Sequence, residues 1–114
     1  MFEVVFFATP SGSEPVLEWL RELGKDEKAV IGADLRTVQL GFPLGMPVCR
    51  PLGDGLFEVR SSLPTRKEAR LIFFQAGNDL VIVAGFIKKT QATPKIEIDR
   101  SRNRKKDYLS KAGK

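Results

Sequence analysis

The sequence predicts an α+β fold in which a helical hairpin packs on one face of a mainly antiparallel, twisted sheet. Segments rich in β-branched and aromatic residues, separated by Gly, Asn and Asp turn formers, dominate the middle of the chain. Segments with helix start signals lie before and after that middle part. With 114 residues and 42% apolar content, the chain has the size of one domain, which we expect to span residues 1–114.

The chain opens with a predicted strand and a pair of helices. Residues Phe2–Ala8 are mostly β-branched or aromatic, and a run of turn formers ends them. Ser13 is expected to cap a short amphipathic helix that ends at Gly24. A second start signal at Asp26 opens a longer helix that Gly41 terminates, so the pair forms an antiparallel hairpin.

Four predicted strands follow as a meander. Val48–Leu52 and Leu56–Leu63 flank a Gly-Asp-Gly sequence, which is a strong turn signal, and are expected to form a β-hairpin. Glu68–Gln75 and Leu80–Ile87 are rich in β-forming residues and are separated by a Gly-Asn-Asp turn.

The last predicted element is a basic and polar helix. Thr93 is the expected N-cap and Pro94 the first helical residue, because proline is preorganised for a helix start. The helix is expected to run from Lys95 to about Leu109 with one thin apolar seam. The element order is therefore strand, two helices, four strands and a helix.

Charge is divided unevenly along the chain. Residues 1–59 carry 5 Lys/Arg against 9 Asp/Glu, and residues 60–114 carry 14 against 5, which together give the net charge of +5. A positive field confined to one half of a small domain suits a nucleic-acid partner, because neutralised phosphates release their counterions. A solvated basic face with a frayed lysine-rich tail is the alternative interpretation.

The single cysteine and the absence of histidine indicate where the protein is located and which catalytic groups it can use. The single cysteine, Cys49, cannot form an internal disulfide, and we find no signal peptide or membrane-length apolar run, so we expect a cytoplasmic protein without membrane contact. Histidine is absent, which removes the usual general base of nucleases and the commonest zinc ligand. Catalysis would depend on Lys, Arg, Asp, Glu, Tyr or a bound metal.

Two arginines interrupt predicted strands. Alternation places Arg60 on one face of its strand and Arg70 on one face of the next, and the turn between these strands makes the two residues neighbours. Charges within apolar strands are costly unless they are paired or face solvent. Ion pairing with Glu58 or Glu68 is one explanation, and binding of an anionic ligand is the other. In the last strand, Lys88 shares a face with Phe86, whereas the direction of Lys89 depends on where the strand ends.

Three segments resemble one toxin superfamily. Residues 52–60 (LGDGLFEVR) are similar to its Leu-aromatic-Glu-aliphatic-Arg strand. Residues 85–94 (GFIKKTQATP) are similar to a second signature, in which a Phe, two Lys and a Thr-Pro lie between the last strand and a helix. Glu97-Ile98, Arg104 and Asp107-Tyr108 continue the match. On these residues the chain resembles the phage-derived, HigB-like branch of the RelE/ParE superfamily.

The resemblance implies a RelE-like single domain that acts as the toxin of a type II toxin-antitoxin system. Such toxins commonly cut messenger RNA in the ribosomal A site and inhibit translation, leaving a 2′,3′-cyclic phosphate and a 5′-hydroxyl. We therefore expect a metal-independent endoribonuclease without a cofactor, whose partners are mRNA, the ribosome and a helix-turn-helix (HigA-like) antitoxin. Ala92 stands where the branch often has Lys, and Ser101 where it has a small apolar residue.

The candidate site combines the residues and the resemblance. The candidate catalytic residues are the clustered cations Arg60, Arg70, Lys88 and Lys89. Both arginines are expected to hold the scissile phosphate, and Lys88 is the candidate base or acid. The candidate RNA contacts are Arg66, Lys67, Phe86, Lys95, Arg102, Arg104 and Lys105. Core packing is an alternative for Phe86, and Tyr108 has either a structural role or a role in the site.

Two other functions remain open at this point. A ParE-like gyrase poison has the same fold, although such members generally lack the clustered cations. A non-catalytic RNA-binding or phage-derived protein would use the basic half for phosphate affinity alone.

Overall fold

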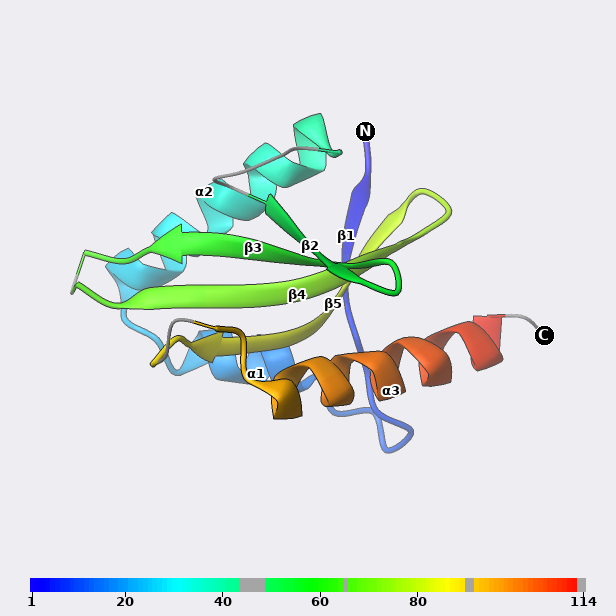
Figure 1. The fold of residues 1–114 in the computed structure, drawn as a ribbon. Coiled ribbons are helices and arrows are strands. Elements are labelled where there is room, and N and C mark those ends of the chain that lie inside the picture. Colours follow the sequence, from blue (N-terminus) through cyan, green and yellow to red (C-terminus); the bar gives the residue numbers. More distant parts are fainter. Residues whose placement is uncertain (44–48, 65, 90–91, 113–114) are drawn as a thin grey trace.

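A computed structural model describes residues 1–43, 49–64, 66–89 and 92–112 of the chain. It consists of a five-stranded sheet with helices on both faces (Figure 1). The strands are β1 (Glu3–Phe6), β2 (Cys49–Gly53), β3 (Leu56–Ser62), β4 (Glu68–Ala76) and β5 (Asp79–Ile87). The helices are α1 (Pro15–Arg21), α2 (Lys25–Gly41) and α3 (Lys95–Ala112). The predicted α+β class and element order are confirmed.

The sheet is mainly antiparallel, with the strand order β1-β5-β4-β3-β2. The last four strands form a meander of antiparallel neighbours. Gly53, Asp54 and Gly55 all have positive φ in the turn between β2 and β3, which is why this turn carries glycines. β1 pairs in parallel with β5, from Glu3 opposite Asp79 to Phe6 opposite Ile82.

Two apolar layers cover the two faces of the sheet. Side chains alternate along each strand, so Val59 and Leu71 join the layer that contains Ile31 of α2, together with residues of α1. Ile72 and Phe74 belong to the other layer, beside α3. The predicted helical hairpin on one face is confirmed, and α3 lies on the opposite face (Figure 1).

The first predicted helix cap is wrong. The structure begins α1 at Pro15, with Glu14 at the cap position and no side-chain cap. The Ser13 hydroxyl instead makes a hydrogen bond of 3.0 Å with the Thr9 hydroxyl within the preceding turn. α1 also ends at Arg21 rather than Gly24, because Gly24 caps α2.

The predicted cap of α3 is wrong as well. The Thr93 hydroxyl donates a hydrogen bond to the Glu58 carboxylate rather than to its own helix. The carbonyl of Pro94 accepts the first helical hydrogen bonds, from the backbone N–H groups of Glu97 and Ile98. The predicted strand start at Val48 lies outside the described residues.

The basic half of the sequence lies largely on the α3 face. α3 carries seven Lys/Arg against three Asp/Glu, whereas α1 and α2 together carry four of each. The two helical faces of the sheet therefore differ in charge. Within the described part of the chain, no helix is long and apolar enough to cross a membrane.

Candidate functional site

Arg60 and Arg70 lie directly opposite each other on neighbouring strands. They are Cα partners in the antiparallel register of β3 and β4, and Arg70 is in turn the partner of Phe86 on β5. Partners in one register row point to the same face, which here is the α3 face. The prediction that the two arginines are neighbours is confirmed.

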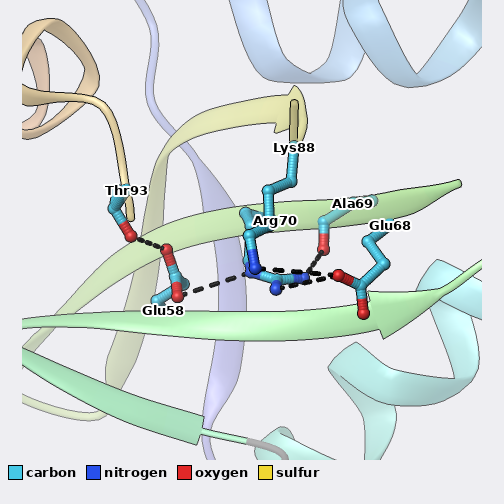
Figure 2. Close-up of polar contacts among 6 residues, drawn as sticks. All are labelled: Glu58, Glu68, Ala69, Arg70, Lys88 and Thr93. Atoms are coloured by element: carbon cyan, nitrogen blue, oxygen red, sulfur yellow. Dashed lines mark hydrogen bonds and ion pairs between the residues drawn. The ribbon is translucent and has the colours of Figure 1, made fainter. Parts of the chain in front are cut away.

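Arg70 lies at the centre of a buried ionic network (Figure 2). Its side chain is 2% exposed, and its Nε lies 3.5 Å from Oε1 of Glu58, which is itself 1% exposed. Its Nη2 donates to Oε2 of Glu68 at 3.3 Å, and its Nη1 donates to the carbonyl of Ala69 at 3.2 Å. The second oxygen of Glu58 accepts the Thr93 hydroxyl. For Arg70 the geometry therefore favours ion pairing over direct contact with a phosphate.

Lys88 extends this network toward the end of the sheet. Its backbone N–H donates to the carbonyl of Glu68 at 2.7 Å, which adds one residue to the β4–β5 ladder beyond Ile87. Its Nζ lies 3.8 Å from Oε2 of Glu68, and its side chain is 14% exposed. Lys88 thus lies beside a carboxylate that Arg70 also contacts (Figure 2).

Arg60 differs from Arg70 in having no ionic partner among the residues that the structure describes. Its residue is half-buried, and within the described ranges its side chain makes no hydrogen bond or ion pair. Like charges directly opposite each other on a sheet are destabilising. The Glu58 and Glu68 carboxylates contact Arg70, whereas no carboxylate of the described residues forms an ion pair with Arg60 on the α3 face.

The remaining predicted cations near this end of the sheet are exposed. Arg66 and Lys67 lie in the turn between β3 and β4, where Arg66 has a φ of 61°. Lys89 is exposed and follows the end of the β5 ladder. The pairing of Lys88 with Glu68 places the β3–β4 turn and the end of β5 at one end of the sheet. The structure therefore brings Arg60, Arg66, Lys67, Lys88 and Lys89 to this end, which we call the basic sheet end.

Three of the four predicted RNA contacts on α3 hold the helix against the rest of the molecule. Arg102 Nε lies 2.7 Å from Oδ2 of Asp54, and Lys105 donates to the Asp54 carbonyl. Arg104 Nη1 donates to the carbonyl of Val83 at 2.7 Å. Lys95 is 89% exposed and pairs with a carboxylate one turn along its own helix, so Lys95 alone of the four makes no contact outside α3 among the described residues.

The environment of Arg104 lowers its pKa. Burial is the main cause, and the positive charge of Arg100 adds to it, whereas Glu97 acts in the opposite direction. The guanidinium of Arg104 also lies over the Phe7 ring, 5.7 Å from the ring centre. Arg104 is consequently a partly buried cation in the interface between α3 and the sheet.

The aromatic candidates pack in the α3-side apolar layer. Phe86 is partly buried against it, as the packing alternative expects. Tyr108 makes an edge-to-face contact with Phe74 at 5.6 Å between ring centres. Phe74 lies four residues along β4 from Arg70, or roughly 13 Å at about 3.3 Å per residue. Tyr108 therefore packs away from the ionic network.

Sequence reasoning missed the parts of the site that long-range contacts create. Thr93 was assigned to its own helix, but it contacts Glu58, which is 35 positions away. No local pattern signals such a contact. The alternation that placed Arg70 also placed Glu58 and Glu68 on the same face, and this was the available signal for the network. In the described part of the chain, no group of three or more His, Cys, Asp or Glu side chains is arranged to hold a metal ion.

The fold and this face define a small α+β protein with clustered cations at one end of its sheet. The model of the family described as "Phage derived protein Gp49-like (DUF891)" matches residues 18–106, and the chain belongs to this family. It is a toxin-like family in the RelE/HigB superfamily. The matched region includes four of the five strands and the whole ionic network. No curated protein matches the chain.

Proposed function

We propose that this chain is the cytoplasmic toxin of a type II toxin-antitoxin system and that it cuts messenger RNA at the ribosome. Membership of a toxin-like family supports the first part. The position of Arg60 is the observation that carries the second part. Arg60 has no ionic partner among the described residues and lies opposite a second arginine, which costs stability, and local arrangements that cost stability are characteristic of functional sites.

The basic sheet end suits a phosphodiester. Arg60 presents a guanidinium that matches phosphate oxygens, and Lys88 and Lys89 add positive charge nearby. Arg66 and Lys67 extend the positive surface for neighbouring phosphates of the RNA strand. A helix-turn-helix antitoxin that covers this end would block the toxin by occupying the same cations.

The proposed reaction needs no group beyond side chains of this end. The ribose 2′-oxygen attacks the adjacent phosphorus, the bond from phosphorus to the 5′-oxygen breaks, and a 2′,3′-cyclic phosphate and a 5′-hydroxyl result. Glu68 accepts the 2′-hydroxyl proton, since its half-exposed carboxylate is the acidic group of the network that solvent reaches. Lys88 gives a proton to the leaving 5′-oxygen, and Arg60 stabilises the charge on the phosphorane.

Arg70 has a different part in this proposal. Because its side chain is 2% exposed, it acts as a positioning residue that holds the Glu68 carboxylate beside Lys88. Thr93 links the same network to the start of α3 through Glu58. The proposed site thus consists of the cations of the basic sheet end and the buried ion pair of Arg70 with Glu58 that supports them.

Purified ribosomes programmed with a defined messenger RNA test the proposal. The wild-type chain should produce new RNA ends carrying 2′,3′-cyclic phosphate, and Arg60→Ala should lower the single-turnover rate by about 10²-fold to 10³-fold. The control variant Arg36→Ala also removes one arginine, which is exposed on α2, and it should cut at the wild-type rate. Intact RNA with inhibited gyrase supercoiling would support the gyrase alternative. Intact RNA with normal supercoiling and strong RNA binding would support the non-catalytic alternative.

A further inference from the structure

A small crevice lies at the edge of β5, away from the basic sheet end. β1 leaves the sheet after its last register pair with Ile82, so the following residues of β5 have no strand beside them on that side. α1 and α3, which lie on opposite faces of the sheet, both pack against β5 (Figure 1). Between them is a hollow of about 150 Å³, which we call the α1–α3 crevice. Its lining residues are Pro15, Val16, Ala84, Gly85, Glu97, Arg100 and Arg104.

The charged wall of the crevice comes entirely from α3. Glu97, Arg100 and Arg104 recur at three- and four-residue spacing, which places them on one side of the helix. Arg100 Nη1 contacts Glu97 Oε1 at 2.9 Å, and Arg104 Nη1 donates to the carbonyl of Val83 at 2.7 Å. Each guanidinium has five N–H donors, so both keep donors for a further ligand.

The crevice carries a surplus of positive charge. Two guanidinium groups line it together with one carboxylate, and the other lining residues are apolar or glycine. Burial is the main cause that lowers the pKa of Arg104, the charge of Arg100 adds to it, and Glu97 acts in the opposite direction. Among the charged lining residues, one carboxylate thus lies beside two guanidinium groups. A partly buried cation without full compensation favours binding of an anion.

The size of the crevice limits the anion. Pockets for drug-sized ligands have volumes of about 300–1,000 Å³, and one water takes roughly 30 Å³ of liquid. A hollow of about 150 Å³ has room for one phosphate group with a few waters, but not for a nucleoside as well. We propose that the α1–α3 crevice binds a single phosphate group through Arg100 and Arg104. The proposal does not require that the chain cut RNA.

Titration with inorganic phosphate at constant ionic strength, followed by NMR of backbone amides, tests the site. The Ala84 and Gly85 amide signals should shift saturably. Arg100→Gln and Arg104→Gln should each weaken the apparent affinity at least tenfold, since each removes one of two charge-assisted contacts. Arg36→Gln, which removes an exposed arginine from α2, should leave the titration unchanged. Because Arg104 also contacts Val83, the half-exposed Arg100 provides the deciding variant if Arg104→Gln does not fold.

Two RNA oligonucleotides, one with and one without a 5′-phosphate, identify the source of the phosphate. Shifts at Gly85 with both, weakened by Arg100→Gln, would assign the crevice to the RNA backbone. Shifts with only the phosphorylated oligonucleotide or inorganic phosphate would assign it to a terminal or free phosphate. The absence of saturable shifts with any probe, or titrations that Arg100→Gln leaves unchanged, would overturn the proposal. Cleavage assays on the same proteins separate this proposal from the proposed RNA cleavage. The chain can cut RNA without binding phosphate in the crevice, and it can bind phosphate in the crevice without cutting RNA.

Discussion

Arg60→Ala and Arg70→Ala should have different effects: the first should mainly reduce RNA cleavage, and the second should mainly reduce stability. The two arginines lie opposite each other on β3 and β4, but Arg70 is 2% exposed and paired, whereas Arg60 is half-buried and unpaired within the described ranges. Arg70→Ala would leave the Glu58 carboxylate buried without its cation. Breaking a buried pair in this way typically costs about 3–5 kcal/mol. Arg60→Ala removes a charge that repels Arg70 and should change stability by less than about 1 kcal/mol in either direction.

These free energies translate into melting temperatures that are easy to separate. For a domain of this size, about 4 °C per kcal/mol is a reasonable scale, so Arg70→Ala should lower Tm by roughly 12–20 °C. Arg60→Ala should stay within about 4 °C of wild type. The double variant Glu58→Leu/Arg70→Met removes both charges and should regain at least half of the loss, because apolar replacement of a buried ion pair is often neutral or stabilising.

Thermal unfolding by circular dichroism and RNA cleavage should be measured on the same purified proteins. Arg60→Ala should retain the wild-type Tm and lose cleavage, and the double variant should fold yet cut poorly because Glu68 has lost its positioning contact. If Arg70→Ala melted like wild type, the buried network would not have the energetic role that its geometry implies. If Arg60→Ala cut RNA at the normal rate, the proposed phosphate contact would be wrong.

Three further predictions concern other parts of the molecule. Burial raises the pKa of the Cys49 thiol from 9.0 to about 11. The stability that the buried neutral thiol contributes should therefore be complete below pH 9 and be lost as the pH rises toward 11. Urea unfolding of wild type and Cys49→Ala across this pH range should show the difference in their free energies of unfolding shrinking above pH 9. A Cβ at Gly85 would lie 2.8 Å from the Trp19 ring, so Gly85→Ala should lower the free energy of unfolding by about 1–3 kcal/mol. Gly32 lies within α2, and a Cβ there would have no atom within 4 Å, so Gly32→Ala should raise the free energy of unfolding by roughly 0.5–1 kcal/mol. The logarithm of the RNA binding constant, measured by anisotropy, should fall against log[salt] with a slope of about −3 to −4. Five cations of the basic half make no side-chain hydrogen bond or ion pair within the described residues, and each neutralised phosphate contributes about −0.7. A slope near about −10 would show that the paired cations also bind.

Local chemistry made most of the fold predictable. The predicted turn formers Gly53–Gly55 and Gly77 have positive φ, and the other bounds of the four meander strands, apart from the start at Val48, lie within one residue of the expected positions. Helix caps were less predictable, because Ser13 and Thr93 both have hydroxyls that can bond elsewhere. In each case a competing partner in the folded chain replaced the helix's own N–H groups.

The positions of distant elements could not be obtained from local patterns. Nothing in the sequence near Glu3–Phe6 indicates a parallel partner, yet β1 pairs with β5 more than seventy residues away. The face occupied by α3 was likewise not fixed by its thin apolar seam. The placement of α3 depends on tethers such as Arg102 with Asp54 and Arg104 with Val83, which exist only after the meander has formed.

The net charge of the basic half overstates the surface that is free to bind a polyanion. Its described cations fall into four groups with different physical roles. Arg70 and Lys88 belong to the ionic network, and Arg102, Arg104 and Lys105 hold α3 in place. A third group makes no side-chain hydrogen bond or ion pair in the described part of the chain, and the fourth group, Lys95, Arg100 and Lys111, pairs with carboxylates of α3 itself. This third group consists of Arg60, Arg66, Lys67, Lys89 and Lys106. The third group meets phosphates without competition from a partner in the chain, whereas a cation that already donates to a carboxylate or a carbonyl must use its remaining donors or give up that partner first. Four of these five cations lie at the basic sheet end, so the unpaired charge, unlike the total charge, is concentrated where Arg60 faces Arg70. In the proposed reaction, an RNA strand would meet these cations beside a carboxylate network that Arg70 already holds in place, and such preorganisation is what stabilisation of a phosphorane transition state requires.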